Sequence, residues 1–118
     1  MRDHTKLKAF QIADEVAVRV YKATASFPKA EQFGMTTQMR RAAVSVASNI
    51  VEGCARDTQA DYLRFLDIAY GSSRELQYQI SLAHRLDYLR KTSHDMLYAS
   101  CTELTKVLNG LIRSLRRK

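Results

Sequence analysis

Apolar residues recur at helical spacing along almost the whole chain and divide it into four amphipathic segments. Between Phe10 and Phe27 they lie three or four residues apart, which is typical of a helix packed nearly parallel or antiparallel to its neighbours. Pro28 ends this segment, because proline cannot continue a helix. The first segment carries its pattern at Phe10, Ala13, Ala17, Val20, Thr24 and Phe27, and the last at Leu97, Cys101, Leu104, Leu108, Leu111 and Leu115.

Capping and turn residues set the expected ends of these helices. Thr36 or Thr37 can cap the second helix, and Asp57 or Thr58 can cap the third. Thr92 followed by Asp95 resembles a capping box in which aspartate replaces the usual glutamate. The sequence therefore predicts an all-α fold, an antiparallel up-and-down four-helix bundle. A chain of 118 residues suits one domain, with helices at 5–27, 36–55, 58–90 and 93–116.

The third helix has two unusual features. Gly71-Ser72-Ser73 places small residues on its apolar face, which indicates either the close approach of another helix or a bend; of these we expect close packing. A second apolar stripe lies about 100° from the first. It serves either as a subunit contact or as packing on the edge of a neighbouring helix, and it consists of Leu63, Leu66, Tyr70 and Tyr88.

The second helix carries a row of polar residues opposite its apolar stripe. The row comprises Arg41, Ser45, Ser48, Asn49 and Glu52, with Glu75 and Gln79 of the third helix as expected partners. One interpretation is a hydrogen-bonded network within the bundle or between subunits, in which a partly buried pair of Arg41 with Glu52 or Glu75 specifies register. The alternatives are a nucleic-acid contact through Arg40 and Arg41, or a solvated helix face.

Motifs spread over most of the chain resemble those of a known family. They are Arg40-Arg41-Ala42-Ala43-Val44-Ser45, Ser48-Asn49-Ile50, Glu52-Gly53, Phe27-Pro28, Gly34, Phe65-Leu66, Ala69-Tyr70-Gly71-Ser72 and Glu75-Leu76. Together they resemble the bacterial four-helix-bundle proteins first found as reading frames in intervening sequences of 23S rRNA genes, also called S23-type proteins. One departure is Ala47, where that family is expected to carry proline; alanine predicts a straighter helix.

The resemblance implies an all-α bundle, often a ring-shaped homo-oligomer, with a link to RNA or other nucleic acid. From it we expect a ring of five subunits. It also allows a role as an accessory to a nucleic-acid enzyme, such as a reverse transcriptase.

Charge adds a candidate surface for a polyanion. The formal net charge is +7, but acids and bases nearly cancel until a cluster at the C-terminus. In a ring, several copies of this cluster would engage phosphates multivalently. The alternative is that these residues suit the negative end of the last helix and keep the protein in solution. The cluster consists of Arg113, Arg116, Arg117 and Lys118.

The sequence favours no enzymatic chemistry. His4, His84 and His94 are isolated, and no Glu-x-x-His pair occurs, so we expect no metal and no cofactor. Ser45 and Ser48 lack a Gly-x-Ser-x-Gly motif. Two cysteines in a chain that starts without a signal peptide, Cys54 and Cys101, are expected to be buried reduced thiols.

These observations predict a non-enzymatic homo-oligomer that binds RNA or DNA mainly through phosphate contacts. The rival hypothesis is a structural or protein-interaction module whose polar row and second stripe serve assembly alone. No apolar run approaches the roughly 20 residues that a membrane span needs, so we expect a cytoplasmic protein without a membrane partner.

Overall fold

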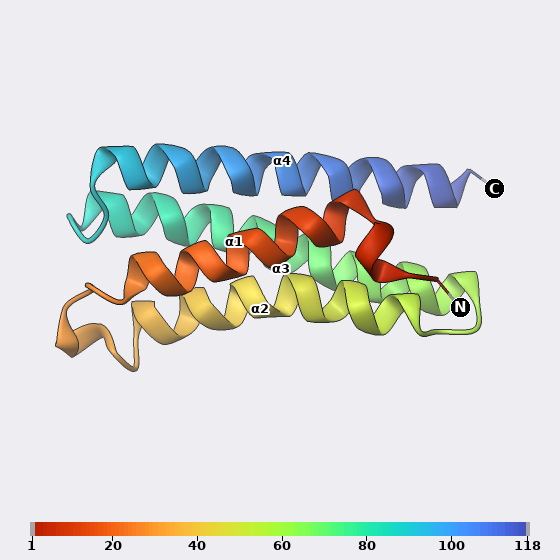
Figure 1. The fold of residues 1–118 in the computed structure, drawn as a ribbon, viewed down its shortest axis with the longest axis horizontal. Helices are drawn as coiled ribbons and strands as arrows, with labels where there is room; N and C mark the ends of the chain where they lie inside the picture. Colours follow the sequence, from red (N-terminus) through yellow and green to blue (C-terminus); the bar gives the residue numbers. More distant parts are fainter. Residues whose placement is uncertain (1, 118) are drawn as a thin grey trace.

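Four antiparallel helices make up the fold seen in the computed structural model, which describes residues 2–117 (Figure 1). They are α1 (Lys8–Thr24), α2 (Met35–Cys54), α3 (Gln59–Arg85) and α4 (Lys91–Arg116). Within the described residues α1 packs closely on α2 and α4, α3 packs closely on α2 and α4, and the backbones of the two diagonal pairs lie further apart. This is the cyclic order of an up-and-down bundle, so the predicted fold class is confirmed. The bundle measures 45 × 23 × 19 Å.

The core follows the apolar spacing of the sequence and runs the length of the bundle. In α1 its centre lies at Ala13, Val16 and Val20, while Phe10 and Ala17 are only half-buried at the edge. Thr24 is also buried, and its hydroxyl donates to the Val20 carbonyl at 2.8 Å. The long helices bury the larger side chains: Met39, Val46 and Ile50 from α2, Leu66, Leu76 and Ile80 from α3, and Leu104 and Leu108 from α4.

The ends of α1 and α2 differ from the predicted ones. α1 begins at Lys8 because Leu7 is extended, and His4–Lys6 form a separate 3-10 turn. The predicted threonine caps of α2 are wrong. Instead the Glu31 carboxylate, on the short 3-10 helix Lys29–Glu31, accepts a hydrogen bond from the Met35 backbone N–H at 3.0 Å.

Of the N-terminal caps predicted for α3 and α4, the first is confirmed and the second is wrong. Thr58 caps α3, since its hydroxyl oxygen accepts the Asp61 N–H at 3.1 Å. The predicted capping box of α4 is wrong. The helix begins at Lys91 with Arg90 as its N-cap, and the Asp95 carboxylate pairs with the Lys91 side-chain ammonium at 2.9 Å instead of accepting a backbone N–H of the first turn. α3 ends at Arg85, and Asp87 then turns the chain with a φ of 63°.

Close helix packing occurs at Gly53 and next to Gly71, but not at Gly71 itself. A Cβ at Gly53 would lie 3.0 Å from the Phe65 Cβ, so α2 and α3 approach there because glycine leaves room. Gly71 is exposed on unbroken α3, and a Cβ there would meet nothing within 4 Å. The predicted close packing of the Gly71-Ser72-Ser73 segment is instead confirmed at Ser73, which is fully buried and whose backbone carbonyl accepts the Cys101 thiol of α4 at 3.4 Å. α2 likewise continues without interruption through Ala47.

Candidate nucleic-acid interface

One end of the bundle collects both ends of the described chain and the connection between α2 and α3 (Figure 1). The Arg2 N–H donates to the Cys54 carbonyl at 3.4 Å, and the Gln59 side chain donates to the Leu115 carbonyl at 2.9 Å. The start of the chain therefore lies beside the end of α2, and the end of α4 beside the start of α3. Arginines from these segments form what we call the arginine end: Arg2, Arg56, Arg64, Arg113, Arg116 and Arg117.

The C-terminal cluster contributes three exposed arginines to this end. Arg116 pairs with Asp67 of α3 at 2.5 Å, which holds its guanidinium against the bundle. Arg113 and Arg117 make no ion pair within residues 2–117, so both are available to an outside anion. Lys118, also predicted for this cluster, lies outside the described residues.

Three arginines that the sequence analysis missed complete the arginine end. Arg2 lies over the Tyr62 ring at 4.0 Å from its centroid, while Arg64 and Arg56 lie 4.7 and 5.4 Å from the Phe65 centroid. Such cation–π contacts orient a guanidinium without neutralising it, and Arg64 in addition lies 3.9 Å from the Asp61 carboxylate of its own helix. A signal was present in the sequence, because an up-and-down bundle of four helices places the chain start, the α2–α3 connection and the chain end together.

Arg40 and Arg41 are neighbours in sequence but have different environments. Arg40 donates to the Thr24 hydroxyl at 2.9 Å and to the Tyr21 carbonyl at 3.3 Å, and it stacks on the Tyr21 ring at 4.6 Å. These contacts join α2 to α1. Arg41 is exposed and lines a shallow pocket with Tyr21 and Val44.

The six predicted nucleic-acid contacts therefore do not form one surface. Arg40 and Arg41 lie in the first half of α2, towards the end of the bundle opposite the arginine end (Figure 1). Arg113, Arg116 and Arg117 lie on the last turns of α4. Only the C-terminal residues join the arginine end.

Part of the predicted polar row forms a bridge between α2 and α3. The hydroxyl oxygens of Ser45 and Ser72 lie 2.8 Å apart. Asn49 donates to the Ser45 carbonyl at 2.8 Å and to its hydroxyl oxygen at 3.1 Å. This chain of bonds lies within one subunit and fixes the register of the two helices.

The remaining members of the row do not join this network. Arg41, Ser48, Glu52 and Glu75 are exposed, and the expected ion pair of Arg41 with Glu52 or Glu75 is absent from residues 2–117. The pair fails because these side chains face solvent. Gln79 is 5% exposed, and its Oε1 atom has no hydrogen-bond partner in the described structure.

The second apolar stripe of α3 does not form an outward face. Leu66 is completely buried, and Leu63, Tyr70 and Tyr88 are partly buried against the same core. Of the two roles expected for the stripe, packing on neighbouring helices therefore holds for Leu66, and the subunit contact is wrong for this residue. The physical reason is that α3 packs on both α2 and α4, so it needs two buried stripes.

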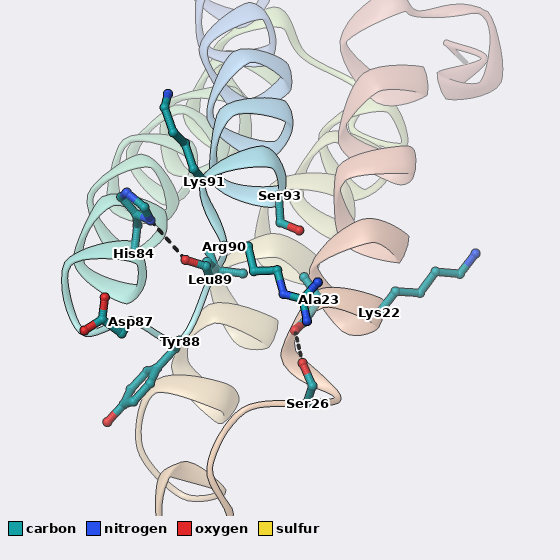
Figure 2. A pocket seen from close by; sticks show the side chains of 10 residues that line it. All are labelled: Lys22, Ala23, Ser26, His84, Asp87, Tyr88, Leu89, Arg90, Lys91 and Ser93. Atoms are coloured by element: carbon teal, nitrogen blue, oxygen red, sulfur yellow. Dashed lines mark hydrogen bonds between the residues drawn. The ribbon is translucent and has the colours of Figure 1, made fainter.

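The connection between α3 and α4 borders a basic pocket of about 630 Å³ at the other end of the bundle (Figure 2). Arg90 extends across it, whereas Lys22 and Lys91 extend away from it, and the Lys91 ammonium is paired with Asp95. The Ser26 hydroxyl at its edge donates to the Ala23 carbonyl at 3.5 Å. This arrangement pairs no nucleophile with a base.

The cysteines are isolated core residues. Cys54 and Cys101 are free and buried, and burial raises the pKa of the Cys101 thiol to about 12. A thiol with so high a pKa does not act as a nucleophile near neutral pH.

Residues 2–117 contain no group of three or more histidine, cysteine or acidic side chains that could hold a metal ion. None of their helices has the length and apolar character needed to cross a bilayer.

Comparisons with known proteins agree with the family resemblance of the sequence motifs. The family described as 23S rRNA-intervening sequence protein matches residues 5–110. A crystal structure of a protein of unknown function from the S23 ribosomal protein family of Bacteroides thetaiotaomicron VPI-5482 is similar, with a TM-score of 0.79 and 27% sequence identity. The match covers 88% of this chain and 97% of that one. No protein with a curated description matches. Because the family match spans most of the chain, this protein belongs to the 23S rRNA-intervening sequence protein family.

Proposed function

We propose that this protein is a non-enzymatic, homo-oligomeric four-helix bundle that binds RNA or DNA through phosphate contacts at the arginine end. The observation that carries the proposal is the convergence of six arginines from separate segments on one end of the bundle. Five carboxylates lie in the same segments, and two of them are already paired: Asp67 with Arg116, and Asp61 with Arg64 at 3.9 Å. The unpaired Arg113 and Arg117 are suited to phosphate, because guanidinium groups bind phosphate oxygens with parallel hydrogen bonds.

Assembly of several copies would strengthen weak contacts at each arginine end. The candidate subunit contact is an exposed surface that we call the α2–α3 face: Val44, Ser48, Val51, Ile68, Gly71 and Tyr78. Its four large members are between 36% and 59% exposed. They follow helical spacing on both helices, and the Ser45–Ser72 contact places the two helices side by side here. This face replaces the predicted stripe as the surface for a ring, for which five subunits stay our expectation.

The same α2–α3 face supports a second candidate function. Exposed apolar residues beside small ones also suit contact with a different protein. In that case the chain is a protein-interaction module, such as an accessory subunit of a reverse transcriptase, and does not bind nucleic acid itself.

Titration with fluorescent single- and double-stranded RNA and DNA at several salt concentrations tests the proposal, with oligomer size measured on the same sample. We expect binding at micromolar concentrations or tighter whose affinity falls steeply with salt. An oligomer that binds no polyanion at low salt would overturn the proposal in favour of the protein-interaction module.

The double variant Arg113→Glu/Arg117→Glu locates the contact. It leaves the Arg116–Asp67 pair intact, so the end of α4 stays docked on α3. The matched control Lys22→Glu/Lys29→Glu makes the same charge change at the opposite end of the bundle. We expect the first variant to lose binding and the second to keep most of it; equal losses would mean that net charge alone attracts the polyanion.

A further inference from the structure

A groove between α3 and α4 combines aromatic rings with unpaired cations. Its pocket of about 320 Å³ is lined by Tyr70, Arg74 and Gln77 from α3 and by Tyr98, Lys106 and Asn109 from α4, among others. No carboxylate lines it. It therefore offers two phenol rings, two positive charges and several neutral hydrogen-bonding groups on one surface, which we call the α3–α4 groove.

The walls of this groove are held together by side-chain hydrogen bonds between the helices. Gln77 donates to the Thr102 hydroxyl at 3.1 Å. Behind it, the Thr105 hydroxyl donates to the Ser73 hydroxyl at 3.1 Å. Because both walls are fixed in this way, the groove exists before any ligand binds.

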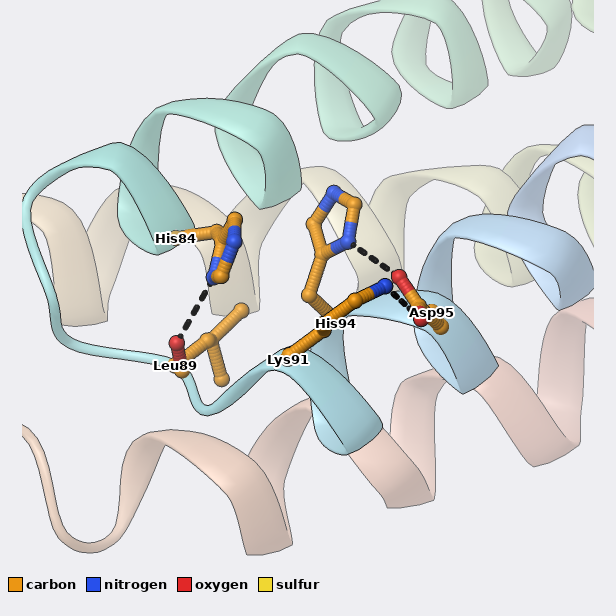
Figure 3. A network of polar contacts seen from close by, with 5 residues as sticks. All are labelled: His84, Leu89, Lys91, His94 and Asp95. Atoms are coloured by element: carbon orange, nitrogen blue, oxygen red, sulfur yellow. Dashed lines mark hydrogen bonds and ion pairs between the residues drawn. The ribbon is translucent and has the colours of Figure 1, made fainter.

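Tyr98 is the last ring of an ordered aromatic stack that leads into the groove. Its ring lies 5.4 Å from the His94 ring at an interplanar angle of 26°, and His94 lies 4.6 Å from the His84 ring at 27°. The orientations of the two histidines are fixed, since His84 Nδ1 donates to the Leu89 carbonyl at 3.0 Å and His94 Nδ1 to the Asp95 carboxylate at 2.9 Å (Figure 3). Tyr98 is 39% exposed and is thus an accessible, pre-oriented stacking surface.

Positive charge continues from the groove towards the arginine end. Arg74 and Lys106 make no ion pair within residues 2–117. Arg113 lies seven residues after Lys106, which puts it two turns further along the same side of α4. The ion pair of Asp67 with Arg116 crosses the same helix pair near the end of this path.

We propose that the α3–α4 groove binds a single-stranded polynucleotide, with a base stacked on Tyr98 and phosphates bound by Arg74 and Lys106. This inference rests on the proposed function and deepens it by naming the form of the nucleic acid and its path. Aromatic side chains beside a cationic track are the means by which proteins bind single strands, because unpaired bases expose faces that a duplex hides. Tyr70 also lines the groove, from α3.

The test uses the whole protein and 20-nucleotide oligo(U) and oligo(dT), each also annealed to its complement. We expect the single strands to bind more tightly than the duplexes at the same salt concentration. A preference for oligo(U) or oligo(dT) then distinguishes RNA from DNA. A copy of each single strand that carries 2-aminopurine reports stacking directly, since the emission of this base falls when it stacks on a ring.

Tyr98→Leu removes the ring and keeps an apolar side chain. We expect single-strand affinity to fall about five- to 150-fold, the range for losing one stacked base, and the 2-aminopurine change to disappear. The matched control is Tyr78→Leu, which removes an exposed tyrosine from α3 on the α2–α3 face and is expected to leave both readouts unchanged. Arg74→Gln/Lys106→Gln tests the groove without altering any packed ring and is expected to weaken binding and flatten its salt dependence.

The results separate the groove from the wider proposal. Suppose that Tyr98→Leu and Arg74→Gln/Lys106→Gln both bind like the original protein, while Arg113→Glu/Arg117→Glu does not. This result would overturn the proposal for the α3–α4 groove and support phosphate binding at the arginine end. Equal affinity for single strands and duplexes without a change in 2-aminopurine emission also overturns the groove. If no polyanion binds at all, both the proposed phosphate binding at the arginine end and the proposed single-strand binding in the groove are wrong.

Discussion

The Tyr88 hydroxyl donates a 2.8 Å hydrogen bond to the Glu31 carboxylate, across 57 positions of sequence. The other oxygen of the same carboxylate accepts the Met35 N–H at the start of α2. One acidic side chain therefore caps a helix and ties the first loop to the turn between α3 and α4. Tyr88 also packs against Phe27, with ring centroids 5.5 Å apart, so apolar and polar contacts hold this end together.

The Glu31 contacts predict a pH-dependent stability. The hydrogen bond from the Met35 N–H, followed by the one from Tyr88, lowers the pKa of Glu31 below its ordinary value of 4.5. A lowered pKa in the folded state means that the stabilisation is present above the ordinary pKa and is lost as the pH falls through the lowered one. Urea unfolding at pH 7 should therefore show Glu31→Gln to be less stable than the original protein, and the difference should shrink at pH 3. A difference that stayed constant with pH would show that the charge of Glu31 plays no part.

Leu66 and Ile68 provide a paired test of which α3 residues belong to the core. Leu66→Ala leaves a cavity at a site with no exposed surface, and we expect it to lower the free energy of unfolding by about 2–5 kcal/mol. Ile68 is 44% exposed, so Ile68→Ala should cost much less within one subunit. Denaturant unfolding at a protein concentration where the oligomer is dissociated measures both values. Similar costs would contradict the burial of Leu66.

A substitution at Gly71 tests directly whether the α2–α3 face is a subunit contact. Nothing in the subunit lies near it, so Gly71→Arg should preserve the helix and even stabilise it by about 0.5–1 kcal/mol through better helix propensity. If copies of the chain meet on this face, the arginine should lower the molar mass measured by light scattering. Gly110 on α4 is equally open, and Gly110→Arg is the control that should leave the molar mass unchanged. An unchanged mass for an oligomeric Gly71→Arg protein would exclude this face.

Substitutions of Arg40 and Arg41 should have different effects on stability. Arg40→Ala removes two hydrogen bonds and a stacked guanidinium between α1 and α2, and we expect a loss of about 1–2 kcal/mol in unfolding free energy. Arg41→Ala should change stability by less than about 0.5 kcal/mol, because its side chain is exposed. Thermal unfolding and polyanion titration on the same samples check this. A polyanion defect for Arg40→Ala without a stability defect would give Arg40 the binding role that its contacts argue against.

Salt dependence can count the contacts made at the arginine end. For duplex DNA the slope of log affinity against log salt is about −0.9 for each phosphate neutralised. Arg113→Gln/Arg117→Gln should therefore flatten the slope by up to about 1.8 for each subunit that engages the duplex. An unchanged slope with a lower affinity would indicate that these arginines act on the structure instead of on the phosphates.

The bundle itself was predictable because helix seams depend on spacing alone. The same spacing does not show which neighbour lies on which side of a helix. For this reason the environments of individual residues could not be predicted. Arg40 and Arg41 are adjacent but point about 100° apart, so one reaches α1 and the other faces solvent. For Leu66 the sequence leaves a subunit contact and packing on a neighbouring helix equally open, because spacing alone does not show which sides of α3 are covered.

The candidate site was less predictable because its members come together only in three dimensions. The C-terminal arginines form a visible run, but Arg2, Arg56 and Arg64 are scattered single residues. Tyr98 and Arg74 belong to different helices, 24 positions apart, and meet because α3 and α4 are antiparallel. The predicted caps of α2 failed for a related reason, since the Glu31 cap comes from a loop whose path the sequence does not specify.

A chain that crosses a bundle four times returns to the end where it started, and here both described ends sit among the arginines (Figure 1). An affinity tag or fluorescent protein fused to either terminus would therefore project over the proposed binding surface and could mask it. A label placed in the connection between α1 and α2, near Lys29, would lie at the far end of a bundle 45 Å long. Immobilising the protein through that connection would present the arginine end to the solution in every molecule.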